Sequence, residues 1–160
     1  MSQDDPLAAV DMLVAAGIHL AVIGGHAVNV HGYLRATEDI DIIFLRRPET
    51  EIRLFEVLNE LEAYYIGDEI DPATSIELTH QITPDFVSSH HLMMLGSRLG
   101  YIDLFDFVPG LPDVRPEDVI GSAINVLGRP FTNLHWLRRM KLAANRPQDR
   151  LDLENLPENS

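Results

Sequence analysis

The sequence predicts an α+β fold, an α/β sandwich in which a mixed β-sheet is flanked by helices and followed by a helical C-terminus. Short apolar or alternating runs separated by amphipathic helical segments occupy the first two thirds of the chain, and helical patterns dominate the last third. The 160 residues, 46% of them hydrophobic, suffice for one sizeable core. We therefore expect a single domain over 1–160, with the sheet core over about 18–110 and the helical part over about 115–157.

Helices and strands are predicted to alternate in the first part of the chain. Acidic residues at positions 4 and 5 precede an apolar helical pattern that ends at Gly17, and Gly32 ends a second short helix. Pro48 opens a third helix, which has one apolar face. The predicted helices cover 7–16, 26–30 and 48–61, and the predicted strands cover 19–23 and 38–44.

The second part of the chain is predicted to contain a hairpin followed by helices. Segment 67–89 has a weak pattern, so we expect loops there with at most one short strand. Two strands joined by a glycine-flanked loop form the hairpin, and Pro116, Thr132 or Asn133, and Pro147 introduce the helices. The predicted strands cover 91–95 and 101–108. The predicted helices cover 116–127, a segment capped by Thr132 or Asn133 that contains Leu134, Leu137 and Met140, and 149–156.

Composition and charge exclude several classes of protein. The chain has no cysteine, which excludes disulfides and thiolate metal sites, and no apolar run long enough to span a membrane. Its acidic start does not resemble a secretion signal, so a cytoplasmic location is expected. A net charge of −13 argues against broad DNA binding, although a local basic cluster at Arg138, Arg139, Lys141 and Arg146 remains available for a phosphate group or for solvent.

Two aspartates are predicted to share one face of the strand at 38–44. Side chains alternate along a strand, so Asp39 and Asp41 project together while Ile40 and Ile42 take the buried side. Adjacent carboxylates repel each other unless a cation lies between them, and their hard oxygens suit Mg²⁺. Two aspartates on a strand also commonly face only water, so this pair alone leaves metal binding open.

A third carboxylate is expected from the strand at 101–108. Asp103 is preferred to Asp106 because it lies between apolar Ile102 and Leu104. The two aspartates are three residues apart and face opposite sides, so only one can join the site, and the other is interpreted as a polar residue at the strand end. Three acids around two Mg²⁺ ions can bind a triphosphate and activate an acceptor hydroxyl.

A glycine pair lies between the strand at 19–23 and the helix at 26–30. Gly24 and Gly25 would let phosphate oxygens approach backbone N–H groups at a helix start. The alternative is an ordinary tight turn. Because the pair lies only fourteen residues before Asp39, a phosphate site and a metal site can share one edge of the sheet. The histidines form no convincing zinc set, since His26 and His31 do not share a helix face.

The stretch from Gly24 to Asp41 (GGHAVNVHGYLRATEDID) resembles the signature of the DNA polymerase beta-like nucleotidyltransferase superfamily, in particular its small bacterial Gly-Gly type and the abortive-infection toxin enzymes. The stretch from Lys141 to Asp152 (KLAANRPQDRLD) is similar to a second motif of those relatives. The resemblance implies the nucleotidyltransferase fold. It further implies that the glycines Gly24 and Gly25 bind the triphosphate and that the carboxylates of Asp39, Asp41 and Asp103 bind magnesium. It also implies that Arg35 and Thr37 reach the nucleotide and that Lys141 steadies its phosphates.

The expected function is therefore transfer of a nucleoside monophosphate from a nucleoside triphosphate (NTP) to an acceptor, with Mg²⁺ as cofactor. The acceptor is a protein hydroxyl, a tRNA end or a small molecule, and the acidic surface slightly favours a protein or small molecule. A regulatory nucleotide-binding module of a toxin–antitoxin pair is the alternative, and the three retained carboxylates argue against it. A homodimer or an antitoxin is a possible partner, while Asp149 and Asp152 are expected only to order the C-terminal helices.

Overall fold

The computed structural model describes residues 5–158, apart from the side chain of Asp68. Asp4, predicted to lie at the start of the first helix, falls outside the described residues. The described helices are α1 (Pro6–Ala15), α2 (Gly24–Val30), α3 (Pro48–Glu60), α4 (Pro84–Ser89), α5 (Pro116–Gly121), α6 (Leu134–Ala144) and α7 (Pro147–Asn155). The described strands are β1 (Leu20–Ile23), β2 (Ile40–Phe44), β3 (Tyr64–Ile70), β4 (Glu77–Gln81), β5 (Leu92–Gly96), β6 (Ile102–Phe105), β7 (Ile124–Val126) and β8 (Arg129–Phe131).

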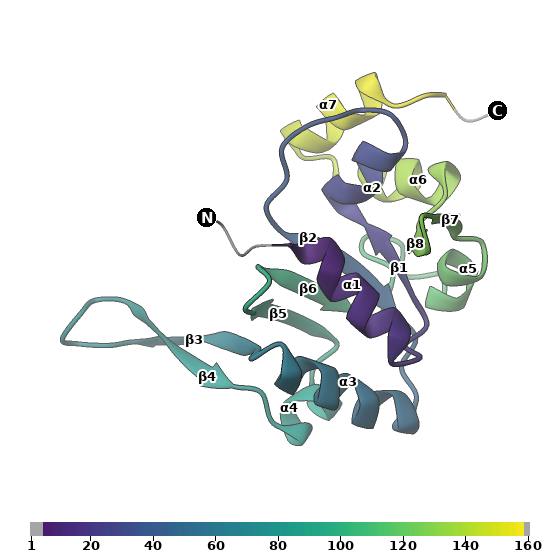
Figure 1. Ribbon diagram of the computed structural model, residues 1–160. Coiled ribbons are helices and arrows are strands. Elements are labelled where there is room, and N and C mark those ends of the chain that lie inside the picture. The colour runs from purple at the N-terminus through teal and green to yellow at the C-terminus, as the bar shows by residue number, and fades with distance from the viewer. Residues whose placement is uncertain (1–4, 159–160) are drawn as a thin grey trace.

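The strands form one mixed sheet in the order β4-β3-β5-β6-β2-β1-β8-β7. β2 lies at its centre, antiparallel to β1 and parallel to β6, and β5 continues antiparallel beyond β6. The hairpin of β3 and β4 forms one edge and extends well away from the body of the molecule (Figure 1). An α+β fold with a mixed sheet, as predicted, is confirmed at this level.

Helices cover the two faces of the sheet unequally. Helices α1 to α4 pack on one face, where the larger hydrophobic core collects side chains from β1, β2, β5 and β6. On the other face a smaller core joins β1 and β2 to α5 and α6, including Ile43, Val119 and Met140. The exposed side chains of Leu92 and Met94 on β5 show that this second cover does not reach β5. The second face therefore has a covered half and an open half.

Most predicted elements are present close to their expected limits. Asp5 caps α1 by accepting a hydrogen bond from the Ala8 N–H, and Asn133 caps α6 in the same way through the Trp136 N–H. The predicted hairpin of β5 and β6 is also present. Strand β2 begins at Ile40 instead of residue 38, so Asp39 lies just before the strand. Within the described chain, no helix has the length and apolar character that crossing a bilayer requires.

The prediction of one helix over 116–127 is wrong. Helix α5 ends at Gly121, and β7 and β8 form a hairpin that extends the sheet beyond the range predicted for it. Leu127 and Gly128 have φ values of 53° and 83°, as in a tight two-residue hairpin turn, and the Asn125 side chain accepts from the Gly128 N–H. The apolar residues of 116–127 are spaced as in a helix, but this turn and the pairing of β8 with β1 make residues 124–131 a hairpin instead.

The prediction of mainly loops over 67–89 is also wrong. The segment contains most of the β3–β4 hairpin and all of α4. The N-cap of α4 is Thr83, whose hydroxyl accepts a hydrogen bond from the Phe86 N–H, and Pro84 follows at the first helical position. Phe86 then stacks on Tyr65 of β3 at a ring-centroid distance of 4.2 Å. The hairpin was not recognised because most of its residues are exposed and lack a strong apolar alternation.

Candidate active site

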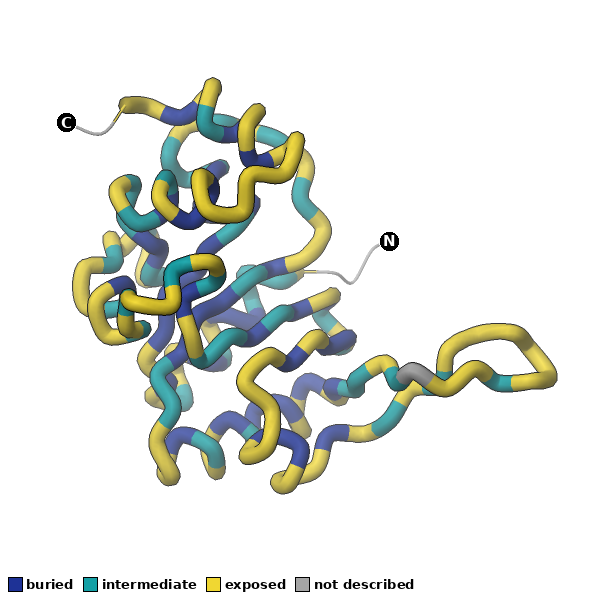
Figure 2. The backbone as a smooth tube through the Cα atoms, turned by 180° about the vertical axis from the view of Figure 1, so that it is seen from behind, coloured by how far each residue is buried: buried dark blue, intermediate teal, exposed yellow. Residues whose placement is uncertain are grey.

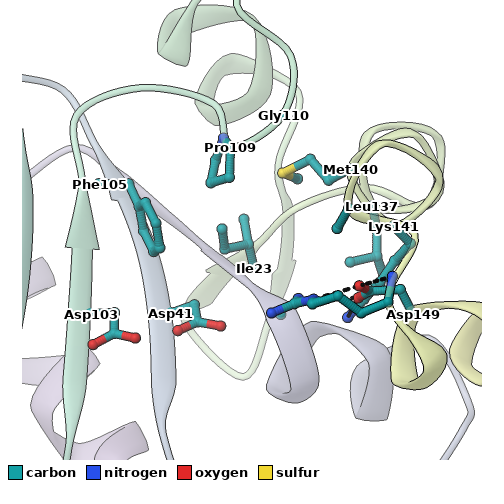
Figure 3. Close-up of a pocket in the computed structure, with 13 residues that line it drawn as sticks. Ile23, Asp41, Asp103, Phe105, Pro109, Gly110, Leu137, Met140, Lys141 and Asp149 are labelled. Carbon is teal, nitrogen blue, oxygen red and sulfur yellow. Dashed lines mark hydrogen bonds and ion pairs between the residues drawn. The ribbon is translucent and has the colours of Figure 1, made fainter.

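Two carboxylates lie side by side at the centre of the sheet. The register pairs Met94 of β5 with Asp103 of β6, Asp103 with Asp41 of β2, and Asp41 with Ile23 of β1. These four residues form one row across the sheet. Asp41 and Asp103 face the same side, and both line the same cavities (Figure 3).

The environment of this carboxylate pair favours its protonated forms. Burial, followed by the nearby Asp103 and Asp39 carboxylates, raises the pKa of Asp41 to about 7, although Lys141 acts in the opposite direction. Burial is also the main reason that the pKa of Asp103 is raised. The pair therefore carries an electrostatic cost at neutral pH that a cation between the carboxylates would relieve.

The two glycines of the strand–helix junction are required by close contacts. Gly24 has a φ of 69°, and a Cβ atom there would collide with the Asp41 carboxylate. A Cβ atom on Gly25 would lie 2.5 Å from the hydroxyl oxygen of Thr37. The backbone at the start of α2 thus lies directly against the Asp41 carboxylate and the segment before β2.

All eight residues that the sequence analysis assigned to the site line one cavity of about 480 Å³, although their assigned roles remain predictions. These residues are Gly24, Gly25, Arg35, Thr37, Asp39, Asp41, Asp103 and Lys141. Residue Asp39 is exposed and lies at the rim, just before β2. Among the residues that the structure describes, no three or more His, Asp or Glu side chains are gathered tightly enough to hold a metal ion by themselves.

A buried ion network holds the cations of this cavity. The Lys141 ammonium is 2.9 Å from an Asp152 carboxylate oxygen and 3.1 Å from Asp149, and all three residues are at most 6% exposed. Arg35 donates two hydrogen bonds to Asp152 at 2.8 and 2.9 Å, and Arg146 contacts Asp149 at 2.6 Å. The two C-terminal aspartates therefore hold the cavity's cations as well as ordering α6 and α7.

This network also sets the protonation of its acids. Burial raises the pKa of Asp149, but hydrogen bonds from Arg146 and Lys141 outweigh it, so the net pKa lies below the ordinary value. Burial also raises the pKa of Asp152, but hydrogen bonds from Arg35 and Lys141 outweigh this effect, so the net pKa of Asp152 is lowered as well. Both carboxylates therefore stay ionised at neutral pH, and the cations keep their partners.

An apolar wall, not anticipated from the sequence, adjoins the carboxylates. A cavity of about 420 Å³ shares Asp41, Asp103 and Lys141 with the first cavity. Its other wall is largely apolar and includes Ile23, Phe105, Pro109, Leu137 and Met140 (Figure 3). Pro109 and Gly110, which follow β6, are turn residues that could have indicated a turn beside the site. No local pattern, however, indicates that α6 packs against this cavity.

Three charged residues that were considered for the site, Asp106, Arg138 and Arg139, instead make hydrogen bonds, ion pairs or ring contacts elsewhere. The Asp106 carboxylate accepts one hydrogen bond from Arg46 at 2.6 Å and pairs with His91 at 2.8 Å. Asp106 lines neither of the two cavities that contain the carboxylate pair. Of the predicted basic cluster, Arg138 donates to backbone carbonyls near the C-terminus, and Arg139 lies over the Trp136 ring. Only Lys141 and Arg146 of that cluster line the cavities described above.

Comparisons with known proteins add little. No family model matches the chain, and no curated protein sequence is significantly similar to it. Among solved structures, the crystal structure of JHP933 from Helicobacter pylori is similar with a TM-score of 0.46 and 14% sequence identity. That alignment covers 92% of this chain and 61% of the other, so this chain spans about three fifths of the length of JHP933.

Proposed function

We propose that this protein is a magnesium-dependent nucleotidyltransferase with the fold of the DNA polymerase beta-like superfamily. The observation that carries the proposal is the carboxylate pair of Asp41 and Asp103, which faces cationic Lys141 and Arg146 across a cavity floored by Gly24. Phosphoryl transfer depends mainly on positioning and on neutralising negative charge. A cavity with acids on one wall and cations on the other suits a reaction that requires both a divalent cation and a polyphosphate.

The charge balance of the cavity supports magnesium as the cofactor. Three cations, Arg35, Lys141 and Arg146, face five carboxylates around the 480 Å³ cavity, so an anionic triphosphate would be repelled without added positive charge. Asp41 and Asp103, with Asp39 at the rim, supply hard oxygen ligands, and Mg²⁺ typically combines one or two carboxylates with phosphate oxygens and water. When bound, magnesium would neutralise charge on the α-phosphate and lower the pKa of an acceptor hydroxyl.

The two cavities suit different parts of a nucleotide: the polar one suits the triphosphate, and the apolar one suits the nucleoside. Phosphate oxygens fit beside Gly24 and Gly25, within reach of Arg35, Thr37 and Lys141. The nucleoside fits against the apolar wall that includes Phe105 and Pro109 and lies next to the same carboxylates. This assignment places the α-phosphate beside the carboxylate pair, where an acceptor hydroxyl can attack it in line.

Transfer of label from a triphosphate tests this function. The protein is incubated with each α-³²P-labelled NTP, Mg²⁺ and a cell extract, and the protein, RNA and small-molecule fractions are counted separately. Asp41→Asn is expected to reduce transfer about 100-fold or more, because it removes a ligand and charge at the reacting centre.

An exposed acid on α7 provides the control. Glu154→Gln is expected to leave transfer unchanged, because this residue is exposed and does not line either cavity described above. Equal transfer by wild type and Asp41→Asn would contradict the catalytic assignment. NTP binding without transfer in any fraction would instead indicate a nucleotide-binding module that has no turnover.

A further inference from the structure

The row of residues that contains the carboxylate pair continues onto the open half of the sheet. Met94 follows Asp103 in this row and is 62% exposed, and Ile66 on neighbouring β3 is 46% exposed. The pairing of Tyr65 with Leu95 places Ile66 one position further along, beside Met94. Figure 2 shows this region from behind, with the β3–β4 hairpin extending into solvent. An apolar strip therefore leads directly away from Asp103, on the side opposite Lys141.

A cavity of about 410 Å³ lies over this strip and shares Glu38, Asp39 and Asp103 with the 480 Å³ cavity. The 480 Å³ cavity and the adjoining 420 Å³ cavity are together called the nucleotide cavity. The apolar side chains of the 410 Å³ cavity include Ile66, Met94 and Tyr101, and its rim carries Glu38 and Glu77. Among its described lining residues there is no lysine or arginine, whereas the nucleotide cavity contains three cations. The two cavities thus meet at shared carboxylates, and of the two only the nucleotide cavity sets cations against its acids.

We infer that this second cavity binds the acceptor, and that the acceptor is a protonated amine with an apolar body and a nucleophilic hydroxyl. The inference rests on the proposed function and specifies the substrate class of the same site. The acceptor oxygen bonds to the α-phosphorus, and the bond from that phosphorus to the bridging oxygen breaks. Pyrophosphate leaves with the electron pair, and the hydroxyl proton passes to the Asp103 carboxylate, which borders both cavities.

Charge complementarity selects this class of acceptor. Glu38 and Glu77 add negative charge to the carboxylates of the reacting centre, so the cavity attracts a cation and repels the phosphates of an RNA end. Met94 and Tyr101 provide apolar contact and a ring face for the body of such a molecule. Free small amines and basic protein segments present the same chemistry, and the fraction that receives label distinguishes these two sources.

Methionine methyl groups allow the two cavities to be tested separately. In protein carrying ¹³C-methyl methionine, Met94 reports on the acceptor cavity and Met140 on the nucleotide cavity, while Met12 on α1 is an internal reference. Tyramine, an aromatic amine with a hydroxyl, is the probe, and 4-hydroxyphenylacetate is its anionic counterpart. We expect tyramine to shift the Met94 resonance and to leave Met140 and Met12 in place, and the anion to shift none of them.

A charge-neutral variant tests the electrostatic part of the inference. Glu77→Gln should weaken tyramine binding about two- to fivefold, as expected for loss of one partly exposed charge contact. Glu60→Gln, at an exposed position on α3 away from the cavity, should leave tyramine binding unchanged. In the extract assay, the label should appear in the protein or small-molecule fraction.

The outcomes separate this inference from the proposed function. A Met140 methyl that does not respond to any NTP with Mg²⁺ counts against the nucleotidyltransferase proposal itself. If Met140 responds to an NTP but Met94 ignores tyramine, or responds equally to the anion, the acceptor inference is overturned while the proposed function stands. Label found only in RNA overturns the inference in the same way.

Discussion

The two sides of the carboxylate pair are built in contrasting ways. On the nucleotide side, Lys141 and Asp152 are at most 6% exposed and belong to a network of ion pairs with Arg35, Asp149 and Arg146. On the opposite side, Met94 on β5 and Ile66 on β3 are 62% and 46% exposed. One side is fixed by buried charge, and the other is an open apolar surface edged by acids.

This contrast fits the different demands of the two proposed ligands. Every nucleoside triphosphate presents the same phosphates, so cations held in one geometry lose little entropy when they bind them. An acceptor varies between enzymes, and residues on an exposed surface can change with little cost to stability. The contrast also implies that substitutions on the nucleotide side affect folding strongly, while those on the open side affect function alone.

The largest effect is expected for Asp152→Ala. The substitution leaves Lys141 without one of its two carboxylates and Arg35 without its bidentate partner in a buried setting. Breaking a buried ion pair from one side costs about 3–5 kcal/mol of unfolding free energy. Urea denaturation measures this loss, and Glu154→Ala, exposed on the same helix, should change stability by less than about 0.5 kcal/mol. Similar losses for both variants would show that the network does not stabilise the fold.

The next effect concerns pH and the carboxylate pair. The folded pKa of Asp41 is about 7 against an ordinary 3.8, so folding favours its protonated form. Stability from this group is therefore present below pH 3.8 and is lost as the pH rises to about 7. Asp41→Asn should raise the unfolding free energy by about 4 kcal/mol at pH 8, and by far less at pH 4.

Magnesium provides the matching control for this pH effect. The ion should stabilise wild type at pH 8, because it relieves the repulsion between Asp41 and Asp103, and it should stabilise Asp41→Asn much less. Thermal unfolding with and without Mg²⁺ measures both changes. If magnesium stabilises the two proteins equally, the ion binds elsewhere, and the contrast between the two sides loses its electrostatic basis.

The sequence predicted correctly those helices and strands that are determined by residues close together in the chain. The strands at the centre of the sheet have runs of apolar residues, and α1 and α6 have capping residues that their helices use. The β7–β8 hairpin was missed because its turn places Leu127, a residue without turn preference, at a positive φ. Its second strand, β8, is held in the sheet by pairing with β1 across more than a hundred residues of sequence, which no local pattern encodes.

The same distinction applies to the candidate site. Asp41 and Asp103 could be paired in advance because strand alternation fixes the face of each, and their residue types limit the chemistry. Lys141 was found through a motif, but its buried contacts with Asp149 and Asp152 depend on how α7 packs against α6. The apolar wall and the open strip at Met94 likewise arise from tertiary packing.

A smaller effect is expected at the glycine junction. In Gly25→Ala the new methyl group would lie 2.5 Å from the Thr37 hydroxyl and displace the backbone beside the phosphate site. We expect NTP affinity to fall about tenfold, a difference of about 1.4 kcal/mol. Gly121→Ala on α5 is the matched control, since a Cβ there meets no atom within 4 Å, and it should bind NTP as wild type does. Isothermal titration with NTP and Mg²⁺ measures both, and unchanged affinity in Gly25→Ala would remove the glycine pair from the phosphate site.

The smallest effect on stability is expected on the open side. Met94→Ala removes an exposed side chain and should change the unfolding free energy by less than about 0.5 kcal/mol, whereas Met140→Ala, at 7% exposure, should cost about 2–5 kcal/mol. Only Met94→Ala should therefore lower label transfer without lowering stability. If Met94→Ala instead destabilises as much as Met140→Ala, the strip is buried in solution, for example against a second copy of the chain, and it cannot be the free surface that an acceptor requires.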